Sequence, residues 1–367
     1  MADLSCVIVH WNVPELLAEC LATLGREAEE LRRQGRVVEI LVVDNNSTAA
    51  AREAMRAAQV PGIRYLWQEE NLGYPRAANA GFAASSAPLV LISNPDVIYL
   101  PGCLNELVAA LADPEVAVAA PATWWDRKRS CKLNPGFPED RERLEADHRA
   151  KQSRSWPQHA LAWQRRMAEG VFATGSRDWP MLSGACLLVR RSQIVAAGGL
   201  FDPALFLYYD DTDLCQRVRA AGFRMLLVPG AEIVHLFDQS HRDDVPVHMA
   251  TSRRYYLDKH YGAEEATRLL RLAAESIPRE DEFAEWPLHD LGECERPPTI
   301  SWRSAGDTLL AMGLNPQLVP AALRRCPGGP QSFCPDFWDQ LSRGVYYLRV
   351  TDLESSQVLG YWKFIKK

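Results

Sequence analysis

The sequence predicts an α/β fold, a Rossmann-like and mostly parallel sheet flanked by helices, with a small β-rich module at the C-terminal end. Over the first 120 residues, short aliphatic segments alternate with stretches whose apolar residues recur at the helical spacing. Strand and helix repeated in this order favour a parallel sheet, because the crossover helices cover both of its faces. Near the C-terminus the pattern changes to the two-residue alternation that is typical of β-hairpins.

Each expected strand is a short run of β-branched or aliphatic side chains, and a helical pattern follows each of the first four. Pro14 suits the first turn of the first helix, in which Leu17 and Leu21 share one face. Ser47 is expected to cap the second helix, residues 78–85 to form the third, and a leucine stripe from Leu104 marks the fourth. The expected strands are residues 4–10, 37–44, 63–67, 88–93 and 115–120.

The composition changes between residues 124 and 178, where the chain becomes charged, rich in tryptophan and irregular. We interpret this stretch as an insertion into a main domain of residues 1–276. Inside it, residues 139–154 carry mixed charges in a helical pattern, which indicates a solvated helix. Residues 277–298 contain seven acids and four prolines and are expected to be a linker.

Residues 299–367 are expected to form a β-rich accessory module. In its last part, Tyr346, Leu348 and Val350 alternate on one strand face, and Val358, Trp362 and Phe364 face them across a turn. A lone hairpin is only marginally stable, so it must pack on further strands, such as one around residues 300–302, or on the main domain. The module would serve substrate binding or oligomer contacts, or act as a brace that covers apolar surface.

Composition and charge restrict the kind of partner. The chain has 41 lysines and arginines against 47 aspartates and glutamates, a formal charge of −6, which argues against nucleic acid as a partner. Nine cysteines without a CxxC pair suit a reducing compartment. The N-terminus shows no secretory pattern, and no apolar run approaches the roughly 20 residues of a membrane span. We therefore expect a cytoplasmic protein, with contact to the inner face of the membrane and homo-oligomer formation left open.

Two aspartates directly follow expected strands, at the edge where parallel sheets bind ligands. Asp44 ends the second strand and could accept a hydrogen bond from a nucleotide base or a ribose, although polar residues end many buried strands. Asp96 follows a proline at the end of the fourth strand, where a carboxylate could hold Mg²⁺ or Mn²⁺ against a pyrophosphate. The alternative for Asp96 is a carboxylate that caps a turn.

Asp210, Asp211 and Asp213 crowd three carboxylates in front of an amphipathic helix. Acids at a helix N-terminus are favoured by capping and by the helix dipole, which explains one or two of them. Crowded like charges also raise the pKa of one member, as a general base requires. His235 lies in an apolar run, where a histidine is more often a core residue than a metal ligand.

Six segments follow one another along the chain: CVIVHWN (6–12), EILVVDNNST (39–48), ENLGYPRAANAGF (70–82), LISNPDV (91–97), SGACLLVRR (183–191) and GGLFDPALFLYYDDTDLCQRVRAAGF (198–223). In this order they resemble glycosyltransferase family 2, the inverting enzymes of the GT-A fold, and most closely their rhamnosyltransferase-like branch. AEIVHL (231–236) matches the late histidine of the family, and the resemblance covers residues 4–262 except for 124–178.

The resemblance implies a role for each matching position. Asp44 would contact the nucleotide base, and Asp96 would bind the metal, with His235 as a further metal or pyrophosphate contact. Asp211 would be the catalytic base. Asp210 stands where the family has a glutamate that positions the acceptor, so its shorter side chain is a departure. The remaining donor-binding positions would be Asn71, Gly73, Arg76 and Asn79 over the nucleotide, and Gly184 beside the sugar.

The expected activity is therefore transfer of a sugar from a nucleotide diphosphate, dTDP- or UDP-linked, to a hydroxyl of a glycan or lipid-linked glycan acceptor. The resemblance favours rhamnose and cell-surface polysaccharide synthesis. One alternative is a nucleotidyltransferase, although HWNVPELL follows the first strand instead of a glycine- and arginine-rich loop. Another is an inactive protein that binds sugar nucleotides or acts as a scaffold.

Overall fold

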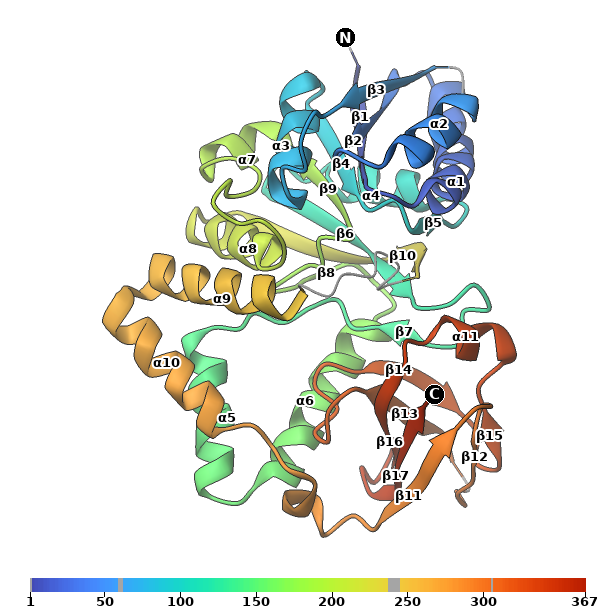
Figure 1. Ribbon diagram of the computed structural model, residues 1–367, viewed down its shortest axis with the longest axis vertical. Coiled ribbons are helices and arrows are strands. Elements are labelled where there is room, and N and C mark those ends of the chain that lie inside the picture. The colour runs from blue at the N-terminus through green and yellow to red at the C-terminus, as the bar shows by residue number, and fades with distance from the viewer. Residues whose placement is uncertain (1, 59–61, 237–244, 305) are drawn as a thin grey trace. The chain divides into compact units, whose positions relative to one another are not determined.

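The computed structural model describes residues 2–58, 62–236, 245–304 and 306–367 (Figure 1). The chain divides into two compact units. Unit 1 comprises residues 1–122, 135–138 and 174–266, and unit 2 comprises 123–134, 139–173 and 267–367. None of the helices in the described ranges is long and apolar enough to cross a membrane.

The sheet of unit 1 contains a parallel core in the order β3-β2-β1-β4. Next to β4, the strand β9 runs antiparallel and separates it from β6. The mixed α/β architecture, a large sheet flanked by helices, confirms the predicted fold class, but among the described strands of this unit the sheet is parallel only from β3 to β4, and the strands beyond β4 pair antiparallel. The strands are β1 (Leu4–His10), β2 (Val38–Asp44), β3 (Ile63–Trp67), β4 (Leu89–Ser93), β5 (Val97–Tyr99), β6 (Val116–Trp124), β8 (Arg177–Asp178), β9 (Cys186–Arg190) and β10 (Arg224–His235).

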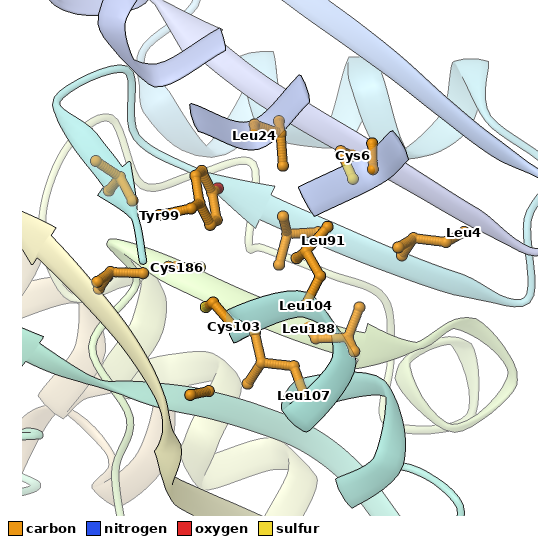
Figure 2. Packing of buried hydrophobic residues seen from close by; sticks show 14 of the residues in the cluster. Leu4, Cys6, Leu24, Leu91, Tyr99, Cys103, Leu104, Leu107, Cys186 and Leu188 are labelled. Atoms are coloured by element: carbon orange, nitrogen blue, oxygen red, sulfur yellow. The ribbon is translucent and has the colours of Figure 1, made fainter. Parts of the chain in front are cut away.

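Alternate residues of each buried strand face opposite helical layers, because side chains alternate across a sheet. Cys6 and Ile8 of β1 belong to the main core with α1 and α4, whereas Val7 packs against Gly81 of α3 on the other face. Figure 2 shows this main core around Leu91, Leu104 and Leu188. The helices of unit 1 are α1 (Pro14–Arg33), α2 (Ala49–Ala57), α3 (Tyr74–Ala84), α4 (Cys103–Ala110), α7 (Arg191–Ala196), α8 (Asp210–Ala220) and α9 (Val245–Tyr261).

Two helix starts differ from the expectation. The cap of α2 is Thr48, whose hydroxyl accepts the Ala51 N–H, whereas the Ser47 hydroxyl accepts a hydrogen bond from the Asn12 N–H. The third helix begins at Tyr74 and not at residue 78, because Pro75 suits the first turn of a helix and Gly73 provides the turn before it.

Unit 2 holds a sheet whose middle is the expected C-terminal hairpin and whose strands pair antiparallel, except that β11 runs parallel to β17. Strand β16 pairs with β17 in a register that sets Tyr346 opposite Phe364, and their rings stack at 5.3 Å. On one side β16 pairs with β13 and on the other β17 pairs with β11. Among the strands that the structure describes, the short strand at Thr299–Ile300 pairs with β15 and not with the hairpin, although Ile300 and Trp302 join the same core.

The expected linker and the expected irregular insertion both contain regular structure. Within residues 277–298, Phe283 and Trp286 are buried and β11 forms a strand, because apolar residues are interspersed among the acids. Within 124–178, two helices contribute to unit 2 together with the C-terminal strands. The elements are β7 (Lys132–Leu133), α5 (Arg141–Gln152), α6 (Trp156–Val171), α10 (Ala263–Glu275), a 3₁₀ helix (Glu280–Phe283), β11 (Leu288–Cys294), β12 (Thr299–Ile300), β13 (Thr308–Gly313), β14 (Ala322–Cys326), β15 (Gln331–Ser332), α11 (Pro335–Gln340), β16 (Gly344–Asp352) and β17 (Val358–Lys366).

Candidate active site

The carboxyl ends of β1 and β2 bring His10 and Asp44 side by side, since these two residues are partners in the parallel register. Nδ1 of His10 lies 3.2 Å from Oδ1 of Asp44, and Nε2 accepts the Val13 N–H at 3.1 Å. A nitrogen that accepts an N–H is unprotonated, so Nδ1 carries the proton and donates it to Asp44. His10 therefore orients the Asp44 carboxylate.

Asp44 is fully buried and ionised. Arg52 donates from Nε to Oδ2 at 2.6 Å, and the Ser47 N–H donates to the same oxygen at 3.3 Å. Burial raises the pKa of Asp44, but the hydrogen bonds from His10, Ser47 and Arg52 outweigh burial and bring the pKa below its ordinary value. The carboxylate is thus preorganised at the strand edge where a base contact was predicted.

The loop after β3 is fixed by two asparagines. Nδ2 of Asn45 donates to Oδ1 of Asn71 at 2.9 Å, and the same Asn71 oxygen accepts the Gly73 N–H at 3.0 Å. Gly73 has φ of 77°, and a Cβ there would lie 2.5 Å from the Phe206 carbonyl oxygen. Only glycine combines this left-handed backbone with such a close approach.

Arg76 and Asn79, which are expected over the nucleotide, bond to the backbone of residues 201–203. Nε of Arg76 donates to the Pro203 carbonyl at 2.6 Å. Asn79 exchanges two hydrogen bonds with Phe201, donating to its carbonyl at 2.8 Å and accepting its N–H at 3.0 Å. Helix α3 therefore holds the loop that leads into α8.

Asp96 and His235 come together through β5 and β10. The antiparallel register sets His235 opposite Val97, and Nε2 of His235 lies 3.4 Å from Oδ1 of Asp96. Burial raises the pKa of Asp96, but the charge and the hydrogen bond of His235 outweigh burial, so the pKa falls below its ordinary value. His235 is nearly buried, yet it faces a carboxylate and not only apolar neighbours.

This pair fits a divalent cation, since Oδ1 of Asp96 and Nε2 of His235 lie only 3.4 Å apart and both are ordinary metal ligands. Within residues 2–58, 62–236, 245–304 and 306–367, no group of three or more His, Cys, Asp or Glu side chains is arranged to hold a metal ion. A cation held by Asp96 and His235 would keep positions for other ligands, as Mg²⁺ does in sites that it shares with phosphates.

Helix α8 begins in an unusual backbone conformation. Tyr208 and Tyr209 have φ of 66° and 62°, so two consecutive non-glycine residues are left-handed directly before Asp210. Each such residue costs on the order of 1 kcal/mol and persists only where the surroundings enforce it. The Leu207 carbonyl accepts a hydrogen bond from Ser252 of α9 at 2.8 Å, which helps to hold this conformation.

Asp211 projects to Gly184. The Gly184 N–H donates to Oδ2 of Asp211 at 2.9 Å, and the Thr212 N–H donates to Oδ1 at 2.7 Å. A Cβ at residue 184 would lie 3.2 Å from Cβ of Asp211, so glycine permits this approach. Burial raises the pKa of Asp211 above its ordinary value, and the two N–H groups limit the rise.

The other two carboxylates of the cluster are in opposite electrostatic situations. Burial and the neighbouring charge of Asp211 raise the pKa of Asp210 to about 8. Burial also acts on Asp213, but the hydrogen bonds from His260, Lys259 and Arg217 bring its pKa far below the ordinary range. Asp213 therefore anchors α8 to α9, which lies beside it (Figure 1). Of the three carboxylates, Asp210 and Asp211 are the two that are not bonded to cationic side chains of the described residues and could act on a substrate.

Sequence reasoning missed three residues of this region: His10, Arg52 and Tyr74. A histidine at the end of a buried strand was a usable signal for the first. Arg52 could not be found because its ion pair depends on how α2 packs. The Tyr74 hydroxyl donates to the Gly184 carbonyl at 3.2 Å, a contact between residues 110 positions apart.

Residues 5–192 match the family model described as glycosyl transferase family 2. The chain belongs to this family. It is 30% identical over 275 residues to N-acetylglucosaminyl-diphospho-decaprenol L-rhamnosyltransferase of Mycobacterium tuberculosis, covering 71% of this chain and 85% of that one. It is also 35% identical to the rhamnosyltransferase WbbL of Escherichia coli, over 74 residues, 20% of this chain and 27% of that one.

Among solved structures, the family 2 chain is similar to a mannosyltransferase from Pyrobaculum calidifontis in complex with GDP-Man and Mn²⁺. The TM-score is 0.49 at 17% identity, over 75% of this chain and 74% of that one. Membership of the family confirms the predicted glycosyltransferase and argues against the nucleotidyltransferase alternative. The relative from Mycobacterium tuberculosis confirms the rhamnosyltransferase-like resemblance.

Proposed function

We propose that this family 2 glycosyltransferase is metal-dependent and inverting, and that it moves a sugar from a nucleotide-diphosphate donor to a hydroxyl group of a glycan acceptor. The observation that supports this best is Asp211, a partly exposed carboxylate fixed by the Gly184 and Thr212 N–H groups at the end of a strained loop. A single displacement needs one positioned base and no covalent nucleophile.

In this reaction the acceptor oxygen attacks the anomeric carbon from the face opposite the diphosphate. Oδ1 or Oδ2 of Asp211 takes the hydroxyl proton, the new glycosidic bond forms, and the bond to the diphosphate breaks. Asp210, buried beside the base, would position the acceptor hydroxyl. At neutral pH its raised pKa keeps it largely protonated, so it can donate a hydrogen bond to a sugar oxygen.

Donor binding would use two groups of residues at the carboxyl ends of the strands, Asp44 after β2 and the pair Asp96 and His235 beyond β4. Asp44, held by His10 and Arg52, faces the base or ribose. Asp96 and His235 would hold Mg²⁺ or Mn²⁺, which when bound neutralises the charge that develops on the leaving diphosphate. Gly184 would line the sugar, while Asn71, Gly73, Arg76 and Asn79 act on the donor through the loops that they fix.

The relative from Mycobacterium tuberculosis is named for rhamnosyl transfer to a diphospho-decaprenol-linked sugar. We extend this to the present chain: a dTDP- or UDP-linked sugar, rhamnose first among them, would be the donor, and a lipid-linked glycan the acceptor. Such an acceptor lies in a membrane, so the enzyme would act from the cytoplasm at the inner membrane face.

The test is a donor screen followed by a transfer assay. The melting temperature is measured with dTDP-, UDP- and GDP-sugars in the presence of Mn²⁺, since a ligand that binds the native state raises it. The stabilising donor is then incubated with a synthetic N-acetylglucosaminyl-diphospho-polyprenol, and NMR gives the anomeric configuration of the product. Inverted product is expected. Retained configuration, or donor binding without any transfer, would contradict the proposal.

A further inference from the structure

The hydroxyl of Tyr74 bonds to Gly184, the same residue that bonds to the proposed catalytic base, Asp211. It donates to the Gly184 carbonyl at 3.2 Å, and the N–H of the same Gly184 donates to Oδ2 of Asp211 at 2.9 Å. Both backbone polar groups of Gly184 are therefore hydrogen-bonded: its carbonyl to the phenol of Tyr74 on α3, and its N–H to the carboxylate of Asp211 on α8.

We propose that Tyr74 is a positioning residue for the general base: it fixes the Gly184 turn and thereby keeps the Gly184 N–H on the Asp211 carboxylate. The inference rests on the proposed function, because it takes Asp211 as the base. Tyr74 acts through Gly184 and has no role in proton transfer itself.

Two further contacts make Tyr74 a rigid support. Its own N–H donates to the Phe206 carbonyl at 3.0 Å, which ties the start of α3 to the loop before α8. Its ring packs 5.9 Å from the ring of Phe201 in the same loop. The residue that holds Gly184 is thus attached to the segment that carries Asp211, so both partners of the Gly184–Asp211 hydrogen bond share one support.

The charges around this hydrogen bond determine the direction of the effect. From α8, Asp210 and Asp213 face the base region together with the Cys215 thiol, and Asp213 is neutralised by its cationic partners on α8 and α9. From α3, Tyr74 is the ionisable group. Burial and then the charges of Asp210 and Asp211 raise its pKa, so the phenol stays protonated and remains a donor.

A hydrogen bond to a carboxylate favours the charged form and lowers its pKa. Loosening Gly184 should therefore raise the pKa of Asp211. In the Tyr74→Phe variant, we expect the acid limb of the kcat against pH profile to move upward and kcat near neutral pH to fall by about threefold to tenfold. The donor KM should change by less than about twofold, because the variant removes none of the contacts that would bind the donor equally in the ground state and in the transition state.

The matched control is Tyr99→Phe, which removes the hydroxyl of another buried tyrosine of unit 1, in the main core shown in Figure 2. Its acid limb should coincide with that of the wild type. A merely structural role of Tyr74 predicts that Tyr74→Phe has a lower melting temperature but a pH profile as unshifted as that of the control, and this outcome would overturn the proposal.

A second variant tests the same path without touching Tyr74. In Gly184→Ala the new methyl group meets Asp211, so the carboxylate should leave the N–H and its pKa should rise. Combined with Tyr74→Phe, the two upward shifts should be less than additive, because both act on one hydrogen bond. Fully additive shifts would contradict the common path.

Titration of the aspartate carboxyl carbons by ¹³C NMR in the substrate-free protein provides a readout that does not depend on turnover. An upward shift of the Asp211 signal in Tyr74→Phe supports the positioning role even if the substrates have been misassigned. If the wild-type enzyme transfers sugar and Asp211→Asn does not, but the Asp211 titration is the same with and without the Tyr74 hydroxyl, only the positioning proposal fails.

Discussion

Gly184 and Asp211 approach each other so closely that a methyl group on residue 184 would lie 3.2 Å from Cβ of Asp211. The approach allows a direct N–H to carboxylate hydrogen bond of 2.9 Å across 27 positions of the chain. It joins the turn before β9 to the first turn of α8. The chemistry that we propose depends on this contact, since it gives a partly buried carboxylate a fixed direction.

The first prediction concerns the base itself. Asp211→Asn keeps the size of the side chain but removes the proton acceptor, so kcat should fall by about 10²-fold to 10⁴-fold while donor affinity stays near the wild-type value. Steady-state kinetics and donor titration by calorimetry measure the two quantities separately. Asp178→Asn, a change in an exposed aspartate, is the control. Near-normal turnover of Asp211→Asn would remove the assignment.

A second prediction follows from the buried acid beside the base. Because the folded-state pKa of Asp210 is raised to about 8, the native state binds more protons than the unfolded state between about pH 4 and pH 8. Stability should therefore be highest at the acidic end of this window and decrease as the pH rises through it.

Asp210→Asn removes this proton linkage. The variant should melt higher than the wild type by a few degrees at pH 8, and the difference should shrink or vanish at pH 5. Melting curves over the pH range, with Asp178→Asn as the control, measure it. A pH-independent difference between variant and wild type would show that Asp210 is ionised in the folded protein at neutral pH.

The third prediction concerns the metal. EDTA should abolish transfer, and Mn²⁺ or Mg²⁺ in excess should restore it. Asp96→Ala should weaken metal-dependent donor binding more than His235→Ala, because the carboxylate supplies formal charge to a hard cation and the imidazole only a lone pair. Donor titrations with and without Mn²⁺ give the two losses. Activity that survives exhaustive chelation would exclude the metal role of both residues.

The fourth prediction concerns truncation after Pro298. Unit 2 builds one core from Cys131 in the middle of the chain and from Phe337, Leu348 and Trp362 near its end. Removing residues 299–367 would take away most of this core and leave Cys131 and the apolar residues that pack against it uncovered, so the shortened protein should aggregate or lose cooperative melting. Deleting only the exposed Lys367 is the control. A soluble truncated protein that still hydrolyses the donor but transfers poorly would instead favour an accessory role in acceptor binding.

The sequence by itself determined the elements of unit 1 and the order of its chemical groups. Mainly apolar runs predicted β1 to β4 within one residue, since strands covered by helices need a nearly continuous apolar segment. The C-terminal hairpin was equally visible, because its alternation of aromatic and β-branched residues is a local pattern. Asp44 and Asp96 could be recognised as strand-end carboxylates for the same reason.

Local patterns failed where a few apolar residues stand among charges. Phe283 and Trp286 are surrounded by acids, which suggested a linker, yet burial of two large rings is enough to order the segment. Ser47 looked like the cap of α2, but the choice between Ser47 and Thr48 depends on where the chain arrives from β2. Neither outcome is encoded in a pattern of neighbouring residues.

Only the tertiary structure decided how the three acids of α8 divide their tasks. Asp213 meets Lys259 and His260 from a helix that follows much later in the chain, and these cations bring its pKa down. Asp211 instead meets the N–H of Gly184. The sequence brings three identical carboxylates within four positions, whereas their charge states and directions are determined by partners that folding brings close, because electrostatic and hydrogen-bond energies depend on distance in space and not along the chain.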